Sequence, residues 1–308
     1  MRVELLSPDE RKQLIEKYLA RFTRRLSPKI IDRMVTTQHT ANPLYLKALL
    51  DELRIYGDHE TLEQRINHYL EAKTVDDLYE KTLERFERDY ECERKGLVRE
   101  AMSLIWASRR GLLESEILAL LGKDNEPLPG AYWSPLYLAL EESLVSRSGL
   151  LNFFHDFLKK AVEDRYLKSQ ESKHASHLRL ADYFQKKELD DRTADELPWQ
   201  LRQAEKWERL KDCITDIPMF MKLMTDATEY ELMGYWLAMG DRFDMVESYN
   251  TAISRLEQTR PSDDSLSFTL NSVARFLYLN ARYAGAEPLY RRALDIKEKV
   301  LGKEHPDT

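Results

Sequence analysis

One short segment, "NFFHDFLKK", places a histidine at the predicted start of a helix. Phe153 and Phe154 precede His155, and an amphipathic helical pattern follows from Asp156. A histidine at a helix start holds its imidazole N–H beside backbone N–H groups that have no helical partner, and this arrangement can bind an anion. The same side chain could instead be a capping or half-buried residue. The segment therefore leaves two interpretations open, an anion sensor and a structural histidine.

A second candidate is Pro43 in "ANPLYLKALLDEL". Proline is favoured at the first position of a helix, where its missing N–H costs nothing. A helix start explains Pro43 without any ligand, so its chemistry depends on what lies next to it.

Other chemistry is excluded or unsupported by spacing. A phosphate-binding loop needs G-x-x-x-x-G-K-[ST], but Gly122-Lys123 and Gly302-Lys303 are followed by Asp and Glu. His174 and His177 in "KHASH" could offer two metal ligands, yet no Cys or third His stands nearby, so we expect a solvated helix start. The sequence predicts no catalytic residue, no metal ligand and no ATP hydrolysis by this chain alone.

Composition indicates a globular protein of two or three domains. The 308 residues are 43% apolar and 33% charged, with a net charge of -7, which argues against nucleic acid as the main partner. Cys92 and Cys213 are too few for a disulfide framework, and we expect two buried thiols in a reducing compartment. No long apolar run or signal peptide is present, so a cytoplasmic location without membrane contact is expected.

Apolar spacing of three and four predicts a mainly α-helical fold. Ser7 followed by Pro8 marks a helix start, and Pro43 opens a helix with Leu46, Leu49, Leu50 and Leu53 on one face, ending at Gly57. The alternating stub Val3 to Leu6 has no partner strand. We therefore expect residues 1–7 to be the remnant of a preceding NTPase domain and residues 8–92 to form a helical lid domain.

Residues 93–170 read as three helices and a β-hairpin, the order of a winged-helix domain. The turn signal "SRSG" separates Leu144 to Ser146 from Leu150 to Phe153, which we expect to pair. Residues 97–168 carry nine basic and ten acidic side chains, and the helix before the hairpin holds two Glu. This charge makes a winged-helix DNA binder the least favoured function.

The remaining chain is predicted as a helical arm (171–260) with degenerate repeats, followed by a repeat (261–308). In "LPWQLRQAEKWERLKDCITD", Leu201, Ala204, Trp207 and Leu210 fall at helical spacing. In the last 40 residues, small Ala274, Ala286 and Ala293 alternate with large Tyr283, Tyr290 and Leu294, the pattern of two antiparallel helices in a helical repeat. A less regular copy, "LAMGDRFDMVESYNTAI", lies about 40 residues upstream.

The segments "GAEPLYRRAL", "VLG" and "HPDT" resemble the tetratricopeptide repeat of the kinesin light chain type. In that family "HPDT" leads into a further repeat, so the resemblance implies a truncated array. Such repeats bind proteins, which makes a protein ligand of the arm and repeats the implied partner.

The order of helical domain, winged helix, helical arm and repeats resembles the C-terminal part of STAND-class signalling NTPases of the NACHT and AP-ATPase type. "ANPLYLKALLDEL" is similar to the G-x-P motif of that class, without its glycine, and "FFHDF" to its "MHD" motif. The resemblance implies that Pro43 packs against the adenine of ADP and His155 reaches its β-phosphate, with ATP or ADP bound by a P-loop domain of the parent protein.

Two functions from different classes follow. The first is the regulatory and sensor half of a nucleotide-switched protein, in which a lid closes over ADP and the repeats bind a protein ligand. The second is a stand-alone helical adaptor that binds a protein without any nucleotide.

Overall fold

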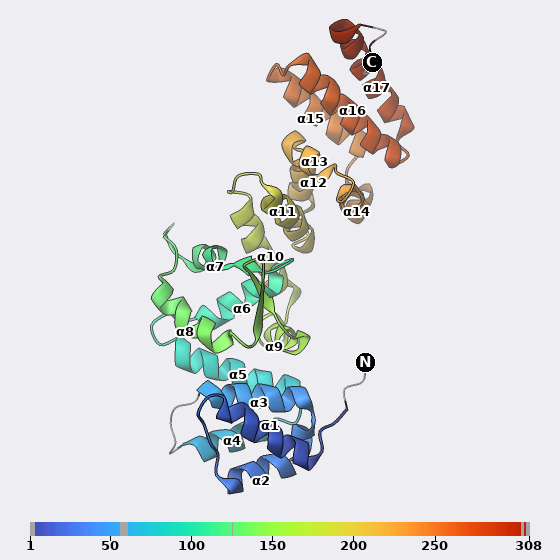
Figure 1. Cartoon of the computed structure of the whole chain (residues 1–308). Helices are drawn as coiled ribbons and strands as arrows, with labels where there is room; N and C mark the ends of the chain where they lie inside the picture. The colour runs from blue at the N-terminus through green and yellow to red at the C-terminus, as the bar shows by residue number, and fades with distance from the viewer. Residues whose placement is uncertain (1–3, 56–60, 125, 303–304, 306–308) are drawn as a thin grey trace. The chain divides into compact units, whose positions relative to one another are not determined.

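A computed structural model of the chain describes residues 4–55, 61–124, 126–302 and 305 (Figure 1). The fold is mainly α-helical, as apolar spacing predicts, and the described part contains one small antiparallel sheet of three strands. Two compact units divide the chain, Met1–Lys173 and His174–Thr308, here named the N-terminal unit and the C-terminal unit. Among the described residues, every helix is too short or too polar to cross a membrane.

The first half of the N-terminal unit consists of helices whose starts are encoded locally. The Ser7 hydroxyl accepts from the Glu10 backbone N–H at 3.3 Å, and the Glu10 carboxylate accepts from the Ser7 N–H at 2.8 Å. This capping box satisfies two backbone donors, and the predicted starts at Pro8 and Pro43 are confirmed. The elements are α1 (Pro8–Ala20), α2 (Pro28–Thr36), the 3-10 helix η1 (Gln38–Ala41), α3 (Pro43–Ile55), α4 (Leu62–Leu70) and α5 (Val75–Tyr90).

The described residues before α1 do not form a strand. Leu6 donates a backbone hydrogen bond to the Ala41 carbonyl at 2.8 Å instead. Val3 of the predicted stub, the predicted helix stop Gly57 and residues 306–308 of "HPDT" lie outside the described residues. The bounds of the five predicted segments stay predictions.

Helix α3 buries the face that its sequence predicts. Leu46, Leu49 and Leu50 are fully buried and Leu53 is nearly so. Four leucines at three and four residue spacing form one continuous stripe, and burying each of them stabilises the fold by about 1.5 to 3 kcal/mol.

A buried ion pair joins α3 to α5. Arg85 contacts the carboxylate of Glu52 through Nε at 2.6 Å and Nη2 at 3.0 Å, and the Tyr69 hydroxyl donates to the same carboxylate at 2.7 Å. The side chains of Glu52 and Arg85 are 6% and 5% exposed. A charge this deep is tolerated only because its partner and its hydrogen bonds are all present.

The second half of the N-terminal unit contains the sheet. The predicted hairpin is confirmed: Leu144 pairs with Phe153 and Arg147 with Leu150. Ser148 and Gly149 both have positive φ, 53° and 82°, which suits the two-residue turn of a tightly twisted hairpin. A short strand that the sequence did not predict joins the other edge, giving the order β1-β3-β2. The elements are α6 (Leu97–Ala107), β1 (Leu112–Leu113), α7 (Glu114–Leu121), α8 (Gly130–Leu140), β2 (Leu144–Arg147), β3 (Leu150–Phe153) and α9 (Asp156–Tyr166).

Charged contacts between α5 and α9 hold the two halves of this unit together. Arg165 pairs with Glu87 at 2.5 Å and also with Glu80, and the Tyr166 hydroxyl donates to Glu87 at 2.5 Å. Hydrogen bonding from Arg165 lowers the pKa of Glu87 below its usual value. The first 90 residues and the sheet-bearing segment are therefore packed as one unit.

The C-terminal unit is built from helices in sequence order. Its elements are α10 (Gln170–Phe184, starting just before the unit boundary), α11 (Asp191–Gln203), α12 (Trp207–Thr215), α13 (Ile217–Leu223), α14 (Glu229–Met239), the 3-10 helix η2 (Gly240–Arg242), α15 (Met245–Gln258), α16 (Asp263–Leu279) and α17 (Tyr283–Leu301). The helical spacing from Leu201 to Leu210 is interrupted, because α11 ends at Gln203 and Glu205 has a positive φ of 52°. Leu201 and Leu210 nevertheless face the same core.

The last two helices pair as the alternation of small and large residues predicts (Figure 1). Ala274, Ala286 and Ala293 are all buried between close-packed backbones. Gly285 lets α17 approach α15 closely, because a Cβ built there would lie 2.7 Å from both methyl groups of Val246. The upstream pair α14 and α15 occupies the less regular copy of the pattern.

Three aromatic rings form the centre of the C-terminal core. Phe220, Tyr249 and Phe276 lie with ring centroids 5.1 to 5.8 Å apart in edge-to-face contact. All three are fully buried, so α13, α15 and α16 share one core.

The structure corrects two expectations about single residues. Cys92 is exposed and Cys213 half-buried, so the prediction of two buried thiols is wrong for Cys92. His177 is buried rather than solvated, with Nδ1 2.8 Å from the Gln200 amide oxygen and its ring against Trp199. The helical pattern around each residue does not reveal which face a distant element covers.

Candidate functional site

His155 occupies the junction between β3 and α9 in extended conformation, directly before the first helical residue. Its side chain makes no capping hydrogen bond to the helix, and among the described residues its imidazole has no hydrogen-bonding partner. Phe154 and Phe157, on either side, are 57% and 40% exposed, and the Phe154 ring contacts the imidazole at 4.3 Å. The capping interpretation of His155 therefore does not hold, and its polar atoms remain available.

The surroundings of His155 favour the neutral imidazole. Burial lowers its pKa from the usual 6.5, the positive charge of Lys47 lowers it further, and Asp51 and Asp156 act in the opposite direction. At neutral pH the ring is thus uncharged and can donate one N–H hydrogen bond.

Lys47 connects this histidine to the helix that Pro43 opens. Asn42 caps that helix by accepting from the Leu44 N–H at 2.9 Å, and Lys47 lies one turn after Pro43. The Lys47 ammonium contacts both carboxylate oxygens of Asp51, at 2.7 and 2.8 Å. The positive charge of Lys47 is one of the causes that lower the pKa of His155.

A second acidic residue ties α3 to the sheet-bearing segment. Glu142, between α8 and β2, pairs with Lys47 at 3.4 Å and with Arg54 at 3.5 Å. Glu142 is one of the two glutamates whose charge disfavoured DNA binding, and it forms ion pairs within the protein.

His155 itself offers the donor that an anion site needs. A neutral imidazole N–H can donate to a phosphate oxygen, whereas the Lys47 ammonium is already paired with Asp51 and Glu142. The roles of Pro43 and His155 toward ADP remain predictions. Sequence reasoning missed Lys47 because its connection to His155 spans more than 100 residues.

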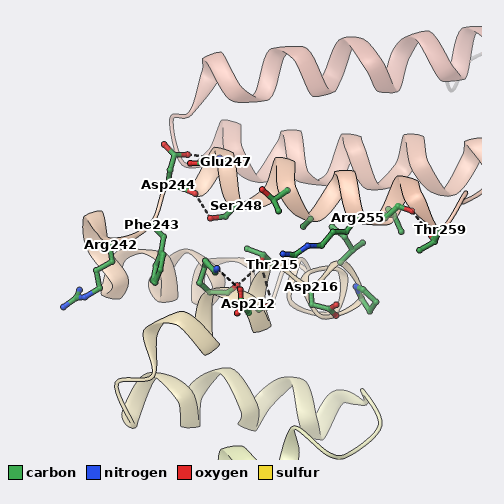
Figure 2. A pocket seen from close by; sticks show the side chains of 16 residues that line it. Asp212, Thr215, Asp216, Arg242, Phe243, Asp244, Glu247, Ser248, Arg255 and Thr259 are labelled. Carbon is green, nitrogen blue, oxygen red and sulfur yellow. Dashed lines mark hydrogen bonds and ion pairs between the residues drawn. The ribbon is translucent and has the colours of Figure 1, made fainter.

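A groove in the C-terminal unit is the second candidate site (Figure 2). It runs between the α12–α13 corner and α15 and has a volume of about 540 Å³. Figure 2 shows Arg255 extending from α15 toward Thr215 and Asp216, with Asp244 and Glu247 toward the other end of α15. The sequence did not single out any of these residues.

Exposed aromatic and aliphatic side chains mark another face of this unit. On α16, Phe268 is 61% and Tyr278 56% exposed, and on α14, Tyr230 and Leu237 are 74% and 84% exposed. Arg275 of α16 pairs with Glu229 of α14 at 2.8 Å, an ion pair that links these two helices. We name Tyr230, Leu237, Phe268 and Tyr278 the aromatic face. Exposed apolar side chains that gather into a contiguous patch are typical of interaction surfaces.

Comparison with known families identifies the last pair of helices. A family described as tetratricopeptide repeat matches residues 269–307. The chain carries a tetratricopeptide repeat. Because the match begins inside α16 and includes α17, the repeat is the helix pair whose small residues the sequence singled out.

Curated relatives extend the similarity beyond the repeat. A TPR repeat-containing protein of Dictyostelium discoideum is 33% identical over 303 residues, covering 93% of this chain and 18% of that protein. Human nephrocystin-3 is 24% identical over 321 residues, covering 99% and 24%. Tetratricopeptide repeat protein 41 of Rattus norvegicus is 26% identical over 257 residues, covering 70% and 20%.

The chain spans about a fifth of the length of these relatives. It is therefore related to one region of larger repeat proteins, and the similarity includes the helices before the repeat. No solved structure matches the chain at a significant level.

Proposed function

We propose that this chain is the regulatory and sensor region of a nucleotide-switched signalling protein of the STAND class, and that its C-terminal unit binds a protein partner. In this proposal residues 8–92 are the lid, residues 93–170 a winged-helix domain and the α3–α9 junction the place where ADP holds the lid closed. A P-loop domain of the parent protein supplies the nucleotide site, because this sequence has no phosphate-binding loop.

The observation that carries the nucleotide part is the state of His155. It is half-buried, has no hydrogen-bonding partner among the described residues, and its pKa is lowered in part by the charge of Lys47 on the helix begun by Pro43. Its imidazole N–H can therefore donate to a ligand. ADP, when bound, would offer its β-phosphate to the imidazole N–H, and Pro43 would pack against the adenine.

We expect His155→Ala in the complete protein to release bound ADP about tenfold faster, because one charge-assisted hydrogen bond to phosphate contributes roughly 1.5 kcal/mol. Release of a fluorescent ADP after addition of excess unlabelled ADP measures this rate. His174→Ala in α10 serves as the matched control and should leave the rate unchanged. Equal release rates for wild type and His155→Ala would contradict the sensor role.

The second candidate is an adaptor in which the C-terminal unit binds a protein and no nucleotide takes part. The aromatic face and the tetratricopeptide repeat favour protein binding in either case. A complete protein that retains no nucleotide on purification, and whose partner binding does not change with ADP or ATP, would select the adaptor.

A further inference from the structure

The lining of the groove between α12, α13 and α15 includes the starts of two helices, α13 and α15. Asp216 caps α13 by accepting from the Met219 N–H at 3.3 Å, and Asp244 caps α15 by accepting from the Glu247 N–H at 2.8 Å. Both aspartates are therefore used by the backbone, and their negative charges are balanced by the helix dipoles.

Most of the remaining charges in the groove also have partners inside the protein. Lys211 pairs with Asp212 at 2.7 Å and lies over the Phe243 ring at 5.4 Å. Arg242 stacks on the Trp207 ring at 5.0 Å and donates to the Met239 carbonyl at 2.8 Å. These groups shape one end of the groove and need no ligand.

Two side chains of opposite charge on α15 differ from these paired groups. Over the part of the chain that the structure describes, neither the Glu247 carboxylate nor the Arg255 guanidinium forms a hydrogen bond or an ion pair, and both side chains are exposed. They are eight residues apart, about 12 Å along a helix that rises 1.5 Å per residue. Glu247 and Arg255 thus present a negative and a positive charge from two fixed positions on one wall of the groove (Figure 2).

Small polar side chains and apolar side chains line the stretch between these two charges. Ser248, Thr251 and Ala252 are small side chains on the α15 wall, while Ile217 and Pro218 lie on the other wall. The Ser248 hydroxyl donates to the Asp244 carbonyl at 2.6 Å, so its lone pairs remain free to accept. Such a channel suits a polypeptide backbone, whose N–H groups can donate to hydroxyl oxygens.

We infer that this groove binds an extended segment of a protein partner in which a basic and an acidic residue are separated by three residues. Four residue-to-residue steps of an extended chain span about 13 Å, close to the distance along the α15 axis between the positions of Glu247 and Arg255. The basic residue pairs with Glu247 and the acidic residue with Arg255. This inference rests on the protein-binding part of the proposed function and names the kind of segment that is bound.

The test uses the whole chain and fluorescein-labelled nonapeptides with the core Lys-Thr-Ser-Thr-Glu or its reversed order, followed by fluorescence anisotropy. A third peptide of the same composition has Lys and Glu adjacent. We expect one order to bind, the adjacent arrangement to bind at least about tenfold more weakly, and Glu247→Lys and Arg255→Glu each to weaken binding about tenfold.

The double variant Glu247→Lys with Arg255→Glu should bind again and prefer the opposite order of charges, a result that general damage to the fold cannot produce. Lys186→Glu, an exposed charge reversal in the turn after α10 and outside the groove, should leave binding unchanged. Equal binding of the adjacent peptide, binding unaffected by both single reversals, or no binding by any peptide at 1 mM, roughly the weakest affinity of a specific contact, would overturn the inference.

The experiments distinguish a wrong inference about the groove from a wrong proposed function. Peptide binding that is lost in Phe268→Ser but unaffected by Arg255→Glu would overturn the groove and assign binding to the aromatic face, leaving protein binding intact. The ADP release experiment uses no peptide, so its outcome is independent of both.

Discussion

At the scale of single residues, some charged side chains pair with each other and stabilise the fold, whereas others have no partner inside the protein. Glu52 and Arg85 neutralise each other inside the N-terminal unit, whereas Glu247 and Arg255 have no partner among the described residues. His155 belongs to the second group, because its imidazole caps nothing although it stands at a helix start. A side chain without a partner inside the protein can still bind a ligand. This property, rather than residue type, distinguishes the candidate site residues from structural ones.

Glu52→Gln should lower the free energy of unfolding of the chain by about 3 to 5 kcal/mol, since it leaves the Arg85 charge buried without a counter-charge. Urea denaturation followed by circular dichroism measures the change. Glu63→Gln removes the exposed partner of Lys29 and should cost less than about 1 kcal/mol. Similar changes in the free energy of unfolding for the two substitutions would mean that water reaches the Glu52–Arg85 pair.

The two cysteines should differ in reactivity toward iodoacetamide. Burial raises the pKa of the Cys213 thiol to about 12, so almost none of the reactive thiolate is present at pH 8, while Cys92 is exposed. Mass spectrometry of the folded chain should show Cys92 modified on the order of 100-fold faster. Between pH 8 and 10 the rate of modification of Cys213 should rise about tenfold for each pH unit, because the thiolate fraction rises by that factor below the pKa. A rate that does not depend on pH would contradict the raised pKa.

At the scale of elements, local sequence determines where some helices start, and close packing determines how others contact each other. The starts of α1 and α3 follow from Ser7, Pro8, Asn42 and Pro43, whose side chains act within one turn. The packing of α17 against α15 depends instead on Gly285, which lets Val246 approach the backbone. A glycine in the first turn of a helix would otherwise be a poor choice.

Gly285→Ala is expected to destabilise the chain by about 1 to 3 kcal/mol, because the added methyl would lie 2.7 Å from the Val246 side chain. Gly234→Ala, inside α14 with no atom near its Cβ position, should stabilise by about 0.5 to 1 kcal/mol through helix propensity alone. Thermal unfolding compares the pair. Adding Val246→Ala to Gly285→Ala should recover part of the loss, and the packing argument fails if both glycine substitutions stabilise equally.

At the scale of the whole molecule, each of the two units has its own buried core. The N-terminal unit brings together the predicted lid and the sheet-bearing segment through Arg165, Glu87 and Glu142. The C-terminal unit carries the aromatic face, the groove and the tetratricopeptide repeat. The proposed functions therefore divide between the units, with nucleotide sensing in the first and protein binding in the second.

Phe220→Ala should destabilise the C-terminal unit by about 3 to 5 kcal/mol, because it opens a cavity beside Tyr249 and Phe276. Hydrogen exchange measured by mass spectrometry should show faster exchange in residues 174–308 than in the N-terminal unit. Leu83→Ala, a fully buried residue of α5, should give the reverse pattern. Equal acceleration throughout the chain in both variants would show that the two cores unfold together.

Much of the fold could be read from the sequence because it depends on neighbours in the chain. The starts of the first helices, the buried face of α3, the hairpin at Ser148 and Gly149 and the small residues between α16 and α17 all follow from contacts within a turn or from a regular period. The resemblance to STAND proteins drew attention to His155 and Pro43, but local pattern could not distinguish a cap from an available side chain.

Tertiary structure decided which side chains meet across long separations. Glu52 lies 33 residues from Arg85, and Lys47 lies 95 residues from Glu142. No periodicity encodes such pairs, because their meeting depends on how several helices pack at once. For the same reason, only the folded chain shows that Cys92 is exposed, that His177 is buried and that Glu247 and Arg255 share a groove.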